Sequence, residues 1–163
     1  MQFDNSREFI LKINQTFHLI LAGPLLFFAY IFLTRSKNHW EGIMKNPEYN
    51  SLVLFILLPV LVLAAIWSFK NYRLGKKQIA KNLPLKEKLE IFQSLFITFQ
   101  IYYAIYGFTS LIGLYITGKV LFSGYFISLL FIASMHNPSV NLICRSLNLS
   151  KEEKDILKHQ KPF

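Results

Sequence analysis

One uncharged stretch limits what this chain can fold into more than any other feature. Ile91 to Gly118 is 28 residues long and contains no Asp, Glu, Lys or Arg. A helix rises about 1.5 Å per residue, so this stretch is longer than the roughly 30 Å hydrocarbon core of a bilayer. The sequence therefore predicts a transmembrane helix with one end that projects into the cytoplasm.

Three further apolar stretches predict an all-α, polytopic membrane protein with four transmembrane helices. The predicted spans cover about residues 15–34, 50–69, 91–117 and 120–136. They make up a transmembrane domain over residues 1–138, and an amphipathic cytoplasmic tail follows over residues 139–163. Ser150 and Glu153 have the spacing of a capping box, so a short helix is expected to begin near Lys151.

The composition agrees with a membrane protein and limits its chemistry. Hydrophobic residues make up 53% of the chain, which is too apolar for an ordinary soluble domain. Sixteen Phe and eight Tyr suit contact with lipid and with the membrane–water interface. Cys144 is the single cysteine, which excludes an intrachain disulfide and a cysteine-based metal cluster.

The basic residues predict an orientation in the membrane. The net charge is +9, and Lys and Arg collect on the cytoplasmic side of membrane proteins, so nucleic acid is not an expected partner. Two basic residues precede the first span, seven lie in a central loop at 70–90 and five lie in the tail, whereas four lie in the other connections. We expect a multi-pass protein of the inner (plasma) membrane with both termini cytoplasmic.

The third predicted helix carries a face of amide-bearing and small residues. Helical spacing groups these residues: Gln93, Gln100, Ala104, Gly107 and Ser110. Such a face is typical of close packing between membrane helices with hydrogen bonds across the contact. The same residues would also suit the polar lining of a pore, and the sequence leaves both interpretations open.

The central loop offers a candidate site for lipid headgroups. Its basic residues include Arg73, Lys76, Lys77 and Lys81. Each can contribute about 1 kcal/mol of attraction to an anionic membrane surface. The alternative is that these charges serve only as an orientation signal.

Groups that would support catalysis or ion coupling are missing from the predicted spans. None contains Asp or Glu, which proton pumps and coupled transporters usually need. No nucleotide-binding loop or nucleophile elbow is present, so neither an enzyme nor a cofactor is expected. His18 and His136 are predicted at similar depth. They could ligate one haem or metal ion, or they could be ordinary interfacial residues.

Residues 76–117 resemble the helical hairpin of the proteolipid, or c subunit, of rotary ATP synthases. Ala80, Lys81, Asn82 and Pro84 resemble its polar loop, and the run from Ala104 to Phe108 resembles its second helix. The tail resembles that of small bacterial four-helix membrane proteins. The resemblance implies a hairpin with a cytoplasmic loop.

Two departures from the proteolipid pattern bear on function. The position of the family's proton-binding carboxylate falls on Ile101, beside Gln100, and neither residue can carry a proton. The second predicted span also lacks the glycines that let the family's inner helices pack into a ring. The resemblance therefore implies a degenerate relative without proton transport.

Three hypotheses for function follow from the sequence. The first is a non-catalytic scaffold or accessory subunit that binds other membrane subunits or itself. The second is an oligomeric channel or transporter lined by the polar face of the third helix. The third is a haem-binding electron carrier that uses His18 and His136.

Overall fold

A computed structural model describes residues 3, 5–38, 42–80 and 82–162 of the chain. These residues form six helices and no strand. The helices are α1 (Ser6–Asn38), α2 (Pro47–Gln78), α3 (Leu85–Thr117), α4 (Leu121–Met135), α5 (Val140–Ser146) and α6 (Lys151–Lys158). The predicted all-α fold is confirmed.

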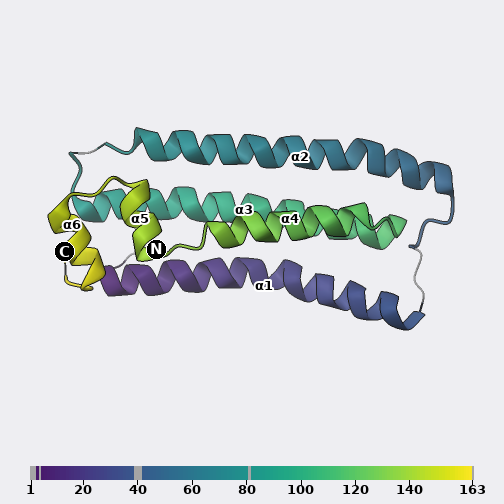
Figure 1. Cartoon of the computed structure of the whole chain (residues 1–163), viewed down its shortest axis with the longest axis horizontal. Helices are drawn as coiled ribbons and strands as arrows, with labels where there is room; N and C mark the ends of the chain where they lie inside the picture. The colour runs from purple at the N-terminus through teal and green to yellow at the C-terminus, as the bar shows by residue number, and fades with distance from the viewer. Residues whose placement is uncertain (1–2, 4, 39–41, 81, 163) are drawn as a thin grey trace.

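The four longest helices lie side by side, with α3 in contact with each of the other three (Figure 1). Helices α1, α2 and α3 are long and apolar enough to cross a membrane. Helix α4 has 15 residues and qualifies as part of a fourth span only together with α5, from which it is bent by 82°. The bend lies between these helices, in the connection that contains Asn137-Pro138. This is expected because proline disfavours helical conformation in the preceding residue. The described residues thus contain three to four candidate spans.

The long helices extend beyond the apolar stretches, which corrects the predicted central loop. Lys70 to Gln78 form the last turns of α2, Leu85 to Glu90 begin α3, and only residues 79–84 connect them. The three long helices have 33, 32 and 33 residues, so α3 is not unusually long. Basic side chains at a helix end can reach water while the backbone stays helical, so a charged segment need not be a loop.

The tail packs onto the end of the bundle where the α2–α3 connection lies (Figure 1). Ile143 of α5 and Leu157 of α6 are fully buried and share one apolar core with Phe9 of α1 and Phe92 of α3. Ser6 also donates a hydrogen bond from its hydroxyl to the carbonyl of Lys161, at 2.6 Å. The tail is therefore part of the same packed body as the long helices.

The predicted start of the tail helix is confirmed. Helix α6 begins at Lys151, and its capping box is complete. The Glu153 amide donates to the Ser150 hydroxyl at 3.2 Å, and the Ser150 amide donates to the Glu153 carboxylate at 2.8 Å. These bonds satisfy two backbone donors that would otherwise lack a partner at the helix start.

Two helical glycines differ in the space around them and allow a test of this packing. A methyl group on Gly113 would lie 2.8 Å from the buried Phe122 ring, whereas one on Gly124 would meet nothing within 4 Å. We expect Gly113→Ala to lower the free energy of unfolding by about 1–3 kcal/mol through overpacking. Gly124→Ala should be neutral or stabilise by up to about 1 kcal/mol, because alanine favours helix.

Thermal unfolding in detergent can be followed with a thiol-reactive dye, since Cys144 is buried and is the only cysteine in the chain. Equal melting temperatures for the two variants would contradict the described contact between α3 and α4.

Candidate functional site

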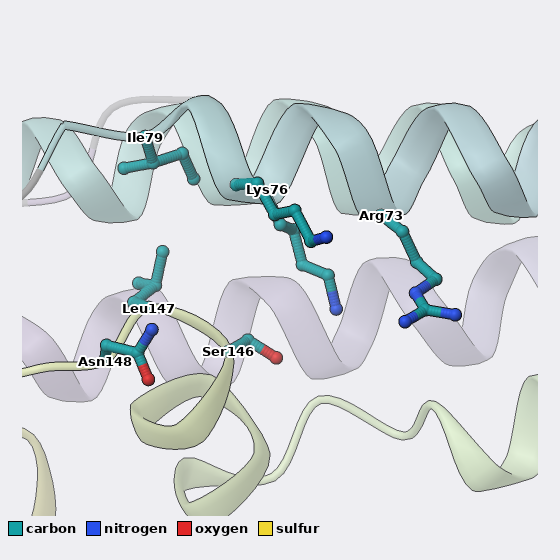
Figure 2. A pocket seen from close by; sticks show the side chains of 7 residues that line it. Arg73, Lys76, Ile79, Ser146, Leu147 and Asn148 are labelled. Atoms are coloured by element: carbon teal, nitrogen blue, oxygen red, sulfur yellow. The ribbon is translucent and has the colours of Figure 1, made fainter.

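A basic pocket lies where the end of α2 faces the end of α5. It has a volume of about 300 Å³, and its lining is Arg73, Lys76, Lys77, Ile79, Ser146, Leu147 and Asn148. Figure 2 shows Arg73 and Lys76 leaving α2 on the side that faces Ser146. Three of the four predicted headgroup residues are thus brought together, and Lys81 lies outside the described residues.

The local sequence explains how the cations are held. Lys76 follows Tyr72 by one turn of α2, and its ammonium lies 4.4 Å from the centre of that ring. Arg73 follows Phe69 in the same way, with its guanidinium carbon 5.8 Å from the ring centre. Each charged group therefore rests on an aromatic face, which attracts cations and limits their conformations.

The cations of the pocket are not paired with acidic groups in the part of the chain that the structure describes. Neither Arg73, Lys76 nor Lys77 forms an ion pair with any carboxylate of a described residue. Ser146 and Asn148 add neutral polar groups to the opposite wall. This combination of charges and hydrogen-bonding groups suits an oxyanion such as a phosphate, which accepts hydrogen bonds and neutralises the cations.

An ion pair joins α3 to α6 of the tail, the segment that also supplies the other wall of the pocket. The Lys88 ammonium of α3 donates to a carboxylate oxygen of Glu153 in α6 at 2.7 Å. Their side chains are 7% and 18% exposed, so water screens this pair less than an exposed one. Burial opposes ionisation of Glu153, but hydrogen bonds from Lys88 and from the Ser150 backbone outweigh it and lower the pKa of that carboxyl.

The polar face predicted on α3 lies mostly inside the bundle. Gln93, Gln100 and Ser110 are buried, as is Gly107, whereas Ala104 is partly buried. Ser110 donates to the carbonyl of Phe122 in α4 at 2.8 Å. A methyl group on Gly107 would lie 3.3 Å from the ring of Phe126, so glycine here permits close approach of α4.

Gln100 is the exception on this face. It is 0% exposed, and neither its amide nitrogen nor its carbonyl oxygen has a hydrogen-bond partner among the described residues. An unpaired amide in an apolar environment costs free energy, because it loses hydrogen bonds to water without replacement. The sequence alone does not indicate a hydrogen-bond partner for the Gln100 amide.

The two candidate haem ligands have different surroundings. His18 is exposed on α1, and its described ring contact is with the neighbouring Phe17. His136 is the C-cap residue that follows α4, where its Nδ1 lies 2.8 Å from the carbonyl of Ile132 and its ring contacts Phe69 and Phe99. No described contact joins the two histidines, and the described residues contain no group of three or more potential metal ligands.

Sequence reasoning missed the residues that the tail contributes. Ser146 and Asn148 lie more than 60 positions in sequence from the cations that line the same pocket, and nothing in their local sequence indicates this arrangement. The apolar groove between α2 and α4 was also missed, since it depends on how both helices lie against α3. Its lining includes Val62, Phe69, Tyr125 and Ile132.

Comparisons with known proteins found no similar protein. No family model, curated protein or solved structure matches the chain. The resemblance to the proteolipid hairpin stays a prediction. In the structure α2 and α3 form two adjacent helices, and Ile101, where the family has its carboxylate, is 45% exposed.

The Lys88–Glu153 pair predicts a dependence of stability on pH. Because the pKa of Glu153 is lower in the folded state, the pair stabilises above the ordinary glutamate pKa of about 4.3 and is lost as the pH falls through the folded value. At pH 7, Glu153→Gln should lower the free energy of unfolding by about 2 kcal/mol, between the values for exposed and buried pairs. The difference should vanish in acid.

Melting temperatures of both proteins between pH 3 and pH 8 provide the measurement. Glu152→Gln is the matched control, because Glu152 is exposed on the same helix. A difference between wild type and Glu153→Gln that stayed constant across this range would count against the ion pair.

The buried amide gives a second prediction. Gln100→Leu keeps a similar side-chain volume and removes two unsatisfied polar atoms, so it should stabilise the protein by about 1–3 kcal/mol. Ser110→Ala removes a satisfied hydrogen bond on the same face and should destabilise by about 0.5–1.5 kcal/mol. The melting temperatures of both variants in detergent test these expectations. A melting temperature of Gln100→Leu below that of the wild type would refute the conclusion that the Gln100 amide is unsatisfied.

Proposed function

We propose that this protein is a non-catalytic, multi-pass membrane protein that serves as a scaffold or accessory subunit of an inner-membrane complex. The observation that carries the proposal is the burial of the polar face of α3 within a single chain. Gln100 and Ser110 are fully buried, and Gly107 lies against the Phe126 ring. These residues are in position to support packing of α3 against its neighbours.

The remaining surface of the long helices supports contact with other membrane components. On α2, Phe55 and Leu63 are 76% and 66% exposed, and on α1 Leu26 is 72% exposed. Apolar side chains of this kind are compatible with lipid tails and with the helices of a partner, where packing drives association. A pore built from several copies would need a polar face between the copies, and the face singled out in the sequence is covered within one chain.

The proposed orientation places both termini in the cytoplasm. Support comes from the arrangement in Figure 1, where the beginning of α1, the α2–α3 connection and α6 lie at the same end of the bundle. Fourteen of the 18 Lys and Arg residues belong to the segments at this end. An excess of basic residues on one side is typical of the cytoplasmic face.

The proposal predicts that the protein leaves its native membrane as part of a larger assembly. We expect particles extracted with a lipid-retaining polymer to have a mass well above that of one chain, with other membrane proteins in fixed ratio. Photo-crosslinking residues placed one at a time at Phe32, Phe55 and Phe131, all exposed, should capture those proteins from at least one position. The same residue at the fully buried Phe92 is the matched control.

A mass equal to one chain and crosslinks no stronger than at Phe92 would refute this function. A closed ring of identical copies without other proteins would favour the channel hypothesis instead. In that case Gln100→Leu should abolish ion flux in liposomes while the protein stays folded.

A further inference from the structure

The basic pocket at the end of α2 and the apolar groove between α2 and α4 lie next to each other along one helix. Arg73 lines the pocket, Phe69 lines the groove, and the Arg73 guanidinium rests over the Phe69 ring. Continuing along α2 at helical spacing, Ile66 and Val62 line the groove further from the charges. One continuous strip of α2 thus changes from cationic to apolar.

The dimensions of this strip match one leaflet of a bilayer. Val62 and Arg73 are 11 residues apart on a helix, which corresponds to about 17 Å. Half of a hydrocarbon core of about 30 Å is about 15 Å. The groove has a volume of about 570 Å³, and at its deep end the Tyr125 hydroxyl of α4 donates to the Leu61 carbonyl of α2 at 2.7 Å. This hydrogen bond ties the two helices together where the apolar strip begins.

We propose that this composite site binds one anionic glycerophospholipid. Its phosphate would accept hydrogen bonds from Arg73, Lys76 and Lys77, and one acyl chain would lie in the groove between α2 and α4. The commitment to a lipid comes from charge complementarity at one end and from the adjoining apolar groove, since a soluble phosphate would leave the groove unused. The inference requires a membrane-embedded chain and is independent of the proposed partner proteins.

The contribution of the tail makes the site more specific than a charged helix end. Ser146 and Asn148 line the pocket on the side opposite α2, and the Ser146 side chain extends toward the cations (Figure 2), so both can bond to further headgroup oxygens. Because Ser146 ends α5 and Asn148 comes two residues later, both belong to the tail, and lipid binding should favour the state in which the tail is docked. A ligand that binds only the folded state raises the melting temperature by mass action.

The test uses the full-length protein in detergent with added lipid. Lipid retention is measured by native mass spectrometry, and stability by the melting temperature. Phosphatidylglycerol is compared with phosphatidylcholine of the same chains, and inorganic phosphate is the soluble probe. We expect one phosphatidylglycerol per chain and a rise in melting temperature, with little effect of the other two ligands.

Replacement of Arg73, Lys76 and Lys77 by Gln should weaken phosphatidylglycerol binding on the order of 100-fold, since each cation near an anionic headgroup contributes roughly a factor of five. The matched control replaces Lys151, Lys154 and Lys158 of α6 by Gln, which removes the same charge at the same end of the molecule. It should change binding less than about threefold if the pocket is specific.

The groove is tested separately with Ser128→Phe, which fills it from an exposed position on α4. This change should weaken phosphatidylglycerol binding at least about tenfold. Leu121→Phe, also exposed on α4, should leave it unchanged.

Three results would overturn the proposal. Equal binding of phosphatidylcholine would exclude headgroup recognition. Equal protection by inorganic phosphate would indicate a free-phosphate site. Equal loss in the α6 control would indicate diffuse charge attraction only.

Discussion

The contact face of α3 governs the arrangement of the whole molecule, because α3 is the helix on which α1, α2 and α4 each pack. Glycines at Gly107 and Gly113 let the rings of Phe126 and Phe122 come close to the α3 backbone. Ser110 adds a hydrogen bond across the same contact. In lipid the hydrophobic effect does not drive helices together, so close van der Waals packing and such hydrogen bonds have to do so.

The groove between α2 and α4 is a consequence of this central position. Both helices lie against α3. Hydrogen bonds such as the one from the Tyr125 hydroxyl to the Leu61 carbonyl connect α2 to α4 at single points. A space lined by apolar side chains then remains along the bundle beside the basic end of α2. The proposed lipid site therefore results from the packing of α2 and α4 on α3.

The tail completes the molecule at one end. Its leucines and isoleucine continue the core formed by Phe9 and Phe92, and the Lys88–Glu153 pair fixes α6 to α3. Docking also brings Ser146 opposite Arg73 and Lys76. A segment that looks like a separate amphipathic extension in the sequence thus acquires a structural role, because its apolar side chains find a partly covered aromatic core at the bundle end.

Local sequence determined the helical class, the length and apolar character that would let the stretches cross a membrane, the break at Asn137-Pro138 and the capping box of α6. Each of these depends on residues within a few turns of one another. The polar face of α3 was also recognisable from its spacing. Tertiary structure alone decided that most of this face is buried within one chain, that the Gln100 amide has no hydrogen-bond partner among the described residues, and that Ser146 and Asn148 line the same pocket as the cations of α2. These features depend on segments that are far apart in the sequence and on how side chains of different helices fit together. The residue pattern of one segment cannot predict them.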